Sequence, residues 1–333
     1  MRENREHEEE LNMMPDTHAQ WGHGVTDAYH RIQSSVRRTP VEEISELVHL
    51  ITARIYVKLE NRQETGSFKL RGATNRILRL TREERDLGIV AASNGNHGLG
   101  VAAAAKSAGI AAEIYVSAQV ASTKSERIEG YGARIVRAGF EPLEAETIAR
   151  DRALKSGRVF ISPYNDWDVL VGQGSIAVEL CEQIPSLDAV FVAVGGGGLI
   201  GGIGAYMKYA SPTTEVVGCW PEHSPVLYEA MKAGRILPVD EKPTLSESTS
   251  GGLEEGSITL DVCRAVVDSC ILVSEEQILD AMRLVYRLKQ WMIEGAAGVA
   301  LAAFLATADR YAGKTVAVVI CGGNLSPKVR ELL

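Results

Sequence analysis

The chain has 333 residues, 45% of them hydrophobic and 23% charged. This is ordinary globular composition, and it excludes a disordered, collagen-like or coiled-coil protein. At about 150 residues per domain, the length predicts roughly two domains with a sizeable core. The net charge of −8 argues against a general nucleic-acid-binding or acidic-membrane surface, because no basic excess exists to displace counterions.

The N-terminal segment and the cysteines bear on where the protein works. Residues 1–22 are highly charged and lack the apolar core of a secretory signal, so we expect a mobile tail. The cysteines are odd in number, widely spaced and without a paired metal-binding motif: Cys181, Cys219, Cys263, Cys270 and Cys321. This usage favours a reducing cytoplasm over a disulfide framework or a structural zinc site.

Short β-rich runs alternate with alanine-rich helical patterns along most of the chain. The expected strands are residues 55–60, 88–93, 112–117, 133–139, 159–163, 189–195, 216–220 and 315–322. Such alternation predicts a parallel, right-handed α/β sheet covered by helices on both faces. We expect residues 88–165 to form a small domain inserted into a larger one made of residues 23–87 and 166–333.

The first polar loop after a strand leads into a helix at Lys69. Gly66 permits a sharp turn, Ser67 is a suitable helix N-cap, and Lys69 falls in the first helical turn. The positive end of the helix dipole lowers the pKa of a lysine there, which suits a nucleophile or a base. An ordinary surface lysine remains the alternative for this loop alone.

The second loop, SNGNHG, brings Ser93, Asn94, Asn96 and His97 to the start of a helix. Short polar side chains and glycines at a helix N-terminus expose several N–H donors together, which favours binding of a carboxylate or phosphate. A simple helix cap with a satisfied surface histidine is the alternative.

The third and fourth loops are rich in glycine. Residues 189–207 carry no charge, but seven of the 19 are glycine, which favours a strand, a phosphate-binding loop and a helix over a membrane span. The pattern GxGxxG from Gly196 to Gly201, followed by Glu222, also matches a dinucleotide fingerprint and keeps an NAD-dependent dehydrogenase open. Cys321 precedes two glycines at the end of the last strand and either faces a flat ligand or is a small buried hydrophobe.

Taken together and in this order, the loops resemble the fold type II pyridoxal-phosphate enzymes, above all the threonine/serine dehydratase (ammonia-lyase) and serine racemase family. The resemblance covers about residues 30–326. It rests on LENRQETGSFKLRGA, SNGNHG, GQGSIA, GGGGLIGG, IEGAAGVA and CGGN. It implies a two-domain α/β fold, similar to the tryptophan synthase β subunit, with parallel-rich twisted sheets flanked by helices.

The resemblance also implies the roles of individual residues. Lys69 would hold pyridoxal 5'-phosphate covalently and later act as the base, with Phe68 beside the ring. The phosphate would lie on Gly195, Gly196, Gly197, Gly198 and Leu199, the ring hydroxyl on Asn96 and the pyridine nitrogen against Cys321, with Glu294 nearby. Ser93, Asn94, Asn96 and His97 would receive the substrate carboxylate. The implied reaction is β-elimination from an L-β-hydroxy amino acid, threonine or serine, giving a 2-oxo acid and ammonia in a cytoplasmic homodimer.

Several departures from the family pattern narrow this interpretation. Relatives more often carry serine at the position of Cys321, and racemases need a serine at the position of Asn94, so efficient racemisation is not expected. The metal-binding acids of racemase-like members fall at Trp220 and Val226, so we expect no divalent cation there. Because the chain ends just after CGGN, we expect no C-terminal regulatory domain.

Other substrates and activities stay open. They are a dehydratase of the 3-hydroxyaspartate or phenylserine type, serine racemisation, and β-replacement of the cysteine synthase type. Outside the class stand the dehydrogenase and a catalytically silent binding protein.

Overall fold

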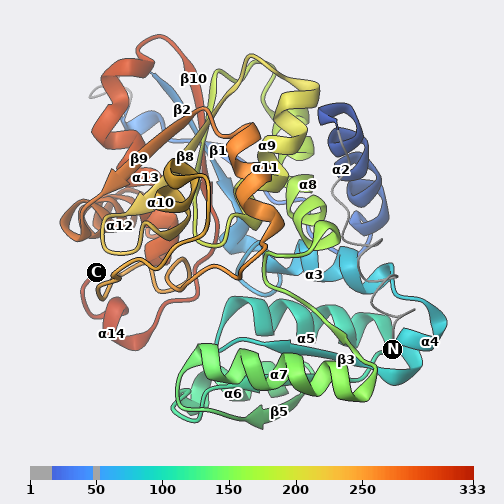
Figure 1. Ribbon diagram of the computed structural model, residues 1–333. Helices are drawn as coiled ribbons and strands as arrows, with labels where there is room; N and C mark the ends of the chain where they lie inside the picture. The colour runs from blue at the N-terminus through green and yellow to red at the C-terminus, as the bar shows by residue number, and fades with distance from the viewer. Residues whose placement is uncertain (1–16, 48–52) are drawn as a thin grey trace.

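The computed structural model describes residues 17–47 and 53–333, which form two separate sheets (Figure 1). The six-stranded sheet has the order β1-β2-β10-β7-β8-β9, and the four-stranded sheet has the order β5-β4-β3-β6. All neighbouring strands are parallel except β1 and β2. The strands are β1 (Val41–Glu43), β2 (Arg54–Leu59), β3 (Ile89–Ala92), β4 (Ala112–Val116), β5 (Arg134–Arg137), β6 (Val159–Phe160), β7 (Ala189–Ala193), β8 (Glu215–Pro221), β9 (Ser269–Val273) and β10 (Thr315–Ile320).

The predicted α/β architecture with mainly parallel strands is confirmed. Every residue of β3, β4 and β7 is buried, as expected for parallel strands that helices cover on both faces. Two strands were not predicted. β1 is only three residues long, and β9 lies at the edge of its sheet with partly exposed positions that do not give an apolar run.

Helices surround both sheets (Figure 1). They are α2 (His18–Ile32), α3 (Lys69–Leu78), α4 (Arg82–Leu87), α5 (Asn96–Ala108), α6 (Ser122–Glu129), α7 (Pro142–Ser156), α8 (Trp167–Gln183), α9 (Gly198–Ala210), α10 (Val226–Ala233), α11 (Ile258–Val266), α12 (Glu275–Lys289), α13 (Gly295–Thr307) and α14 (Pro327–Arg330). Short 3-10 turns occupy Ser45–Leu47, Glu60–Arg62 and Ala308–Tyr311. Within the described ranges, no helix combines the length and apolarity that a membrane span requires.

The start of α2 corrects the predicted N-terminal tail. Residues 17–22 do not belong to a tail, because Thr17 caps α2 and its side chain accepts a hydrogen bond from the Gln20 backbone N–H at 3.3 Å. The Trp21 side chain is buried and packs against Trp167, with the ring centroids 6.2 Å apart. The tail prediction for residues 1–16 lies outside the described residues.

Each sheet has its own apolar core, and α3 lies at the boundary between them (Figure 1). The core of the four-stranded sheet includes Leu70, Ala73 and Ile77 of α3, although the sequence analysis grouped this helix with the larger part of the chain. Packing therefore joins the lysine-bearing helix to the smaller sheet as well.

Behind the first turn of α3 lies a fully buried cluster of charges. The Arg71 guanidinium donates to Glu60 at 2.8 Å and to Glu179 at 2.7 Å, and the Lys58 amine donates to Glu179 at 2.5 Å. Burial alone would raise the pKa of Glu60, but the Arg71 guanidinium holds it below its usual range. Two cations and two carboxylates balance, so the cluster joins β2, α3 and α8 without leaving an unpaired charge.

Removing one carboxylate from this cluster should destabilise the protein strongly. Glu179→Gln leaves the Lys58 and Arg71 cations with one carboxylate in a buried site, so we expect the free energy of unfolding to fall by about 3 kcal/mol in urea titrations. The control is Asp151→Asn, which removes an exposed i,i+4 partner of Lys155 and should cost less than about 0.5 kcal/mol. Equal losses in the two variants would contradict this prediction.

Candidate active site

Four loops that follow parallel strands converge where the two sheets meet. The backbone N–H of Phe68, in the loop after β2, donates to the Cys321 carbonyl after β10 at 3.0 Å. From the loop after β3, the Asn96 amide donates to both carboxylate oxygens of Glu294, at 3.0 and 2.9 Å. Lys69 in turn contacts Pro163, in the loop that follows β6. Loops at the carboxyl ends of strands are where open α/β sheets bind ligands.

Lys69 is the first residue of α3, and its amine is largely enclosed. Nζ donates to the Pro163 carbonyl at 2.7 Å and lies 5.1 Å from the centre of the Phe68 ring. Burial lowers the pKa of Lys69 to about 8, although Cys321 and Glu294 act in the opposite direction. No carboxylate lies within salt-bridge distance of Nζ in the described part of the chain. The amine therefore loses its proton at a lower pH than an ordinary lysine, with the midpoint near pH 8.

Cys321 and Glu294 are both buried beside this amine. Burial and the Glu294 carboxylate raise the pKa of the Cys321 thiol well above its ordinary value, so the sulfur stays protonated. Burial also raises the pKa of Glu294, against hydrogen bonds from Asn96, Ser248 and the Asn324 backbone N–H. The site thus holds a neutral thiol and a carboxylate that several donors stabilise.

The loop after β3 leads into the N-terminus of α5 and leaves several polar side chains partly exposed. Ser93, Asn94 and Asn96 are partly exposed, and the Ser93 hydroxyl accepts a hydrogen bond from the Gly95 N–H at 3.1 Å. The Ser93 hydroxyl proton remains free to donate. With the unpaired N–H groups of the first helical turn, it makes a site suited to a carboxylate.

Two residues predicted for this carboxylate site are engaged elsewhere. The His97 ring is buried, and its Nε2 lies 2.8 Å from the Ile161 carbonyl, which can only accept a hydrogen bond. Burial lowers the pKa of His97 to about 3, so the neutral ring has no second proton for a carboxylate, and only its backbone N–H can contribute. The Asn94 amide binds Ser117 through both its oxygen and its nitrogen, each at 2.9 Å.

The four consecutive glycines connect β7 to α9 with no room for side chains. A Cβ on Gly196 would lie 2.4 Å from the Tyr164 ring, and one on Gly195 would lie 2.8 Å from the Thr249 backbone. Gly197 has a φ of 88°, which favours glycine, and Leu199 is buried in the first turn of α9. The backbone amides here have the form of a phosphate cradle at a helix N-terminus.

Several contributors have no individual role predicted from the sequence, although residues 162–166 and 248–252 are expected from it to shape the substrate pocket. Pro163 supplies the acceptor for the lysine, Tyr164 covers the glycine loop, and Ser248 donates to Glu294 at 2.8 Å. Asn324 contacts Asn96 at 2.7 Å. From the sequence, Pro163 and Asn324 could be suspected only because they also follow strands. Ser248 lies in a loop with no regular pattern.

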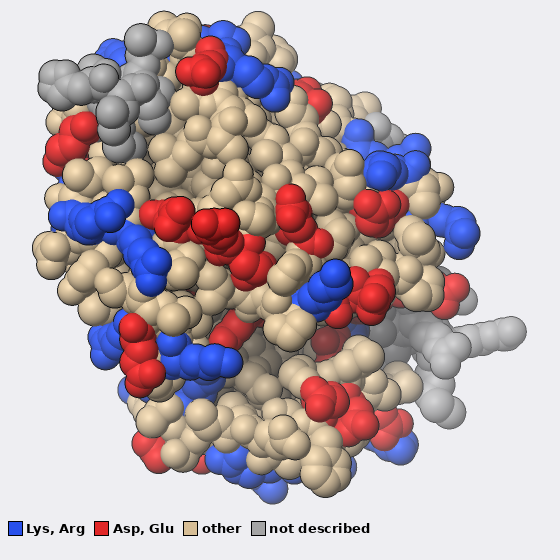
Figure 2. Space-filling view, turned by 90° about the vertical axis from the view of Figure 1, so that its left-hand side faces the viewer, with Lys and Arg blue, Asp and Glu red and all other residues tan. Residues whose placement is uncertain are grey.

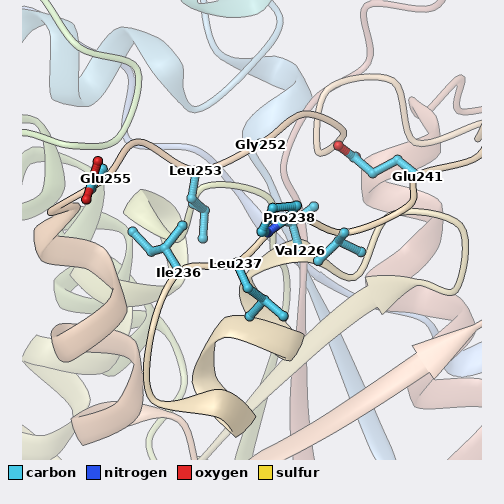
Figure 3. Close-up of a pocket in the computed structure, with 9 residues that line it drawn as sticks. Val226, Ile236, Leu237, Pro238, Glu241, Gly252, Leu253 and Glu255 are labelled. Atoms are coloured by element: carbon cyan, nitrogen blue, oxygen red, sulfur yellow. The ribbon is translucent and has the colours of Figure 1, made fainter.

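Neither the charges on one face of the surface (Figure 2) nor the pocket described below involves the candidate site. Figure 2 shows acidic and basic side chains interspersed over one face, without an extended basic area on that face. A surface pocket of about 400 Å³ lies between α10 and the segment before α11, lined by Val226, Ile236, Leu237, Pro238, Val239, Glu241, Gly252, Leu253 and Glu255 (Figure 3). None of the predicted site residues lines it. Across the described residues, no group of three or more His, Cys, Asp or Glu side chains is arranged to hold a metal ion.

A half-buried lysine at a helix start, a polar loop at a second helix N-terminus and a tetraglycine loop meet between two mainly parallel sheets, an arrangement typical of the fold type II pyridoxal-phosphate enzymes. The sequence profile described as "Pyridoxal-phosphate dependent enzyme" matches residues 32–322. The chain belongs to this family. The match removes the NAD-dependent dehydrogenase that the sequence analysis had kept open.

Known relatives place the chain among the ammonia-lyases and dehydratases of the family. It is 38% identical over 301 residues to an L-threonine ammonia-lyase of Thermotoga maritima, covering 90% of this chain and 75% of the relative. It is 33% identical to an L-threo-3-hydroxyaspartate ammonia-lyase of Saccharomyces cerevisiae, covering 91% and 93%. The solved structure of maize serine racemase matches with a TM-score of 0.88 at 29% identity, covering 93% of this chain and 95% of that one. The chain is a pyridoxal-phosphate-dependent lyase.

The residues present fit the cofactor. The enclosed amine of Lys69 carries no carboxylate partner among the described residues, and the loop of residues 195–198 packs so closely that it presents its backbone without side chains. The phosphate of the cofactor needs such a cradle, and its aldehyde needs an unprotonated amine. Lys69, the Gly195–Gly198 loop and Asn96 are therefore the groups that would hold it.

The depressed pKa of Lys69 can be measured on the cofactor-free protein. Competitive labelling with acetic anhydride should show Lys69 gaining reactivity with a midpoint near pH 8, because the amine loses its proton there. Nα-acetyl-lysine, the control, should show its midpoint near about pH 10.4. A Lys69 midpoint at pH 10 or above, read from the labelled peptide by mass spectrometry, would refute the assignment.

Proposed function

We propose that this lyase is a dehydratase that converts a small L-β-hydroxy amino acid, threonine or serine, to a 2-oxo acid and ammonia. The observation that carries the proposal is the enclosed Lys69 amine, whose pKa of about 8 suits a base at neutral pH. The anion site at Ser93 and Asn96 lies in the loop that contacts Glu294, which supports binding of an amino-acid carboxylate beside that base. The similarity to an L-threonine ammonia-lyase supports the substrate class.

Each polar group has a task in this reaction. Bound pyridoxal phosphate supplies an electron sink for the α-carbon of the substrate. The Ser93 hydroxyl and the N–H groups that open α5 hold the substrate carboxylate, which orients the α-proton. The Lys69 amine takes that proton and keeps it at Nζ. The neutral Cys321 thiol provides no carboxylate charge to the ring nitrogen, which favours prompt loss of the β-hydroxyl over a long-lived carbanion.

The Asn94 contacts support elimination over racemisation. Racemisation needs a second acid or base on the opposite face, and an amide can be neither. Both polar atoms of the Asn94 amide also bind Ser117, so the group is turned toward the end of β4.

We also propose that the enzyme acts as a cytoplasmic homodimer. The family resemblance supports the dimer, and the five cysteines, all of them free, support a reducing compartment. Sedimentation velocity of the cofactor-loaded protein tests the subunit number directly, and a monomeric mass would oppose it.

The reaction is tested by assaying the purified holoenzyme for 2-oxo acid release. The panel is L-threonine, L-serine, L-threo-3-hydroxyaspartate and L-threo-phenylserine, with D-serine formation measured separately. The highest kcat/KM should fall on threonine or serine. A preference for hydroxyaspartate or phenylserine would contradict the proposed substrate, threonine or serine. D-serine as the main product would contradict the proposed elimination reaction.

Lys69→Ala should abolish turnover while the fold persists, because the base and the point of cofactor attachment disappear together. We expect kcat to fall by at least about 10³-fold and the visible absorption of the wild-type protein to be lost. In the wild type, borohydride should leave the cofactor attached to the Lys69 peptide in mass spectra. Lys155→Ala, an exposed lysine paired with Asp151, is the matched control and should retain full activity. Substantial activity in Lys69→Ala would refute the role of Lys69.

A further inference from the structure

Asn324 connects four separate segments around the site, three through its side chain and one through its backbone N–H. Its Nδ2 donates to the Asn96 Oδ1 at 2.7 Å and to the Thr65 carbonyl at 2.9 Å. Its Oδ1 accepts a hydrogen bond from the Arg127 guanidinium at 2.9 Å, and its backbone N–H donates to Glu294 at 3.3 Å. The side-chain amide therefore contacts the loop before the catalytic lysine, the loop of Asn96 and helix α6, while the backbone of the same residue contacts a buried acid.

Arg127, Asn324, Asn96 and Glu294 form a series of hydrogen bonds. The groups at its two ends fix which atom donates at each step. Arg127 can only donate, and an ionised Glu294 can only accept. Asn324 must therefore point its oxygen at Arg127 and its nitrogen at Asn96. Asn96 must in turn point its oxygen at Asn324 and one N–H at Glu294. The second N–H of the Asn96 amide remains for a ligand.

The backbone around Asn324 is shaped to accept this amide. Gly66 has a φ of +76°, and a Cβ there would lie 2.8 Å from the Asn324 Oδ1. The Gly323 N–H also donates to the Gly66 carbonyl at 3.0 Å. A side chain at residue 66 would push the amide away, so the close approach of the two loops depends on glycine.

The contact with Arg127 crosses between the two sheets. Arg127 lies on α6, which packs on the four-stranded sheet, whereas Asn324 follows β10 of the six-stranded sheet. Among residues 17–47 and 53–333, no carboxylate lies within 4 Å of the Arg127 guanidinium. The hydrogen bond to Asn324 is therefore not a by-product of an ion pair that holds Arg127 in place.

We propose that Asn324, backed by Arg127, is a positioning residue for the cofactor. It holds the Asn96 amide so that its remaining N–H faces the ring hydroxyl, and it ties that orientation to the position of α6. The inference rests on the proposed function, since Asn96 would bind the ring hydroxyl only in a pyridoxal-phosphate enzyme. Without Asn324, the Asn96 amide keeps Glu294 as its only side-chain anchor among the residues that the structure describes.

The test uses the full chain and compares Asn324→Ala, Arg127→Ala, the double variant and Lys124→Ala. Lys124 is the matched control, because it lies on the same helix and crosses to the other side through a 3.5 Å ion pair with Glu247. Three quantities are measured: the dissociation constant of pyridoxal phosphate for the cofactor-free protein, the visible absorption maximum as a function of pH, and kcat with KM.

Asn324→Ala should weaken cofactor binding by about tenfold and shift the pH dependence of the absorption band, because one anchored hydrogen bond to the ring hydroxyl is loosened. Arg127→Ala should weaken binding by about threefold. The double variant should match Asn324→Ala within about twofold, since Arg127 acts only through Asn324. Lys124→Ala should leave the dissociation constant and the spectrum unchanged.

Two results would overturn the positioning role. One is an unchanged dissociation constant and spectrum in Asn324→Ala, and the other is full additivity of the Asn324 and Arg127 effects. If Asn324→Ala fails to fold by circular dichroism, Arg127→Ala decides alone, because its exposed side chain can be removed without disturbing a core. A wild-type protein that binds no pyridoxal phosphate would instead overturn the proposed function itself.

Discussion

The enclosed amine of Lys69 is the constraint on which the rest of the site depends. Burying a cation without an ion-pair partner is unfavourable, and burial accordingly lowers the pKa of the amine to about 8, although Cys321 and the Glu294 carboxylate act in the opposite direction. The other carboxylates near α3 are paired with different cations. Arg71, two residues further on, is balanced by Glu60 and Glu179, so the carboxylates behind α3 are already committed to other cations. A nucleophilic lysine results because the local charges are balanced without it.

The two sheets supply different parts of the same site. β2, β7 and β10 belong to the six-stranded sheet and end in the lysine loop, the glycine cradle and the Cys321 loop, whereas β3 of the four-stranded sheet ends in the carboxylate-binding loop. Parallel pairing makes this possible, because it brings strand ends from distant parts of the sequence to one edge. The candidate site therefore draws its loops from both sheets.

The sequence predicted the parts of the site that depend on backbone shape and failed on those that depend on side-chain partners. The glycine cradle, the helix start at Asn96 and the placement of Lys69 all follow from local turn and helix rules, and the structure has them. His97 was read as a carboxylate ligand because it lies in the right loop. Its ring instead binds the Ile161 carbonyl, 64 residues away in sequence, a contact that no local pattern reveals. Residues 17–22 contain no Asp, Glu, Lys or Arg, and they were misjudged because they were grouped with the charged stretch that precedes them. Trp21 is in fact buried against Trp167.

The contact between the part built on the six-stranded sheet and the part built on the four-stranded sheet is polar on the side where the candidate site lies. Arg150 on α7 pairs with Glu254 and stacks over the Phe160 ring, and Asn165 also donates to Glu254 at 2.9 Å. Asn96 and Glu294 join the halves in the same way at the centre. When such polar contacts open, water replaces the lost hydrogen bonds, so the net free-energy cost is small. Opening an apolar interface of similar extent would expose apolar surface to water and cost more. Because each sheet keeps its own apolar core, the polar side of the joint can rearrange around a substrate without disrupting either core. Helix α3 packs in the core of the smaller sheet, but Arg71 also joins it to Glu60 and Glu179. The helix that carries Lys69 is therefore held by both parts of the chain.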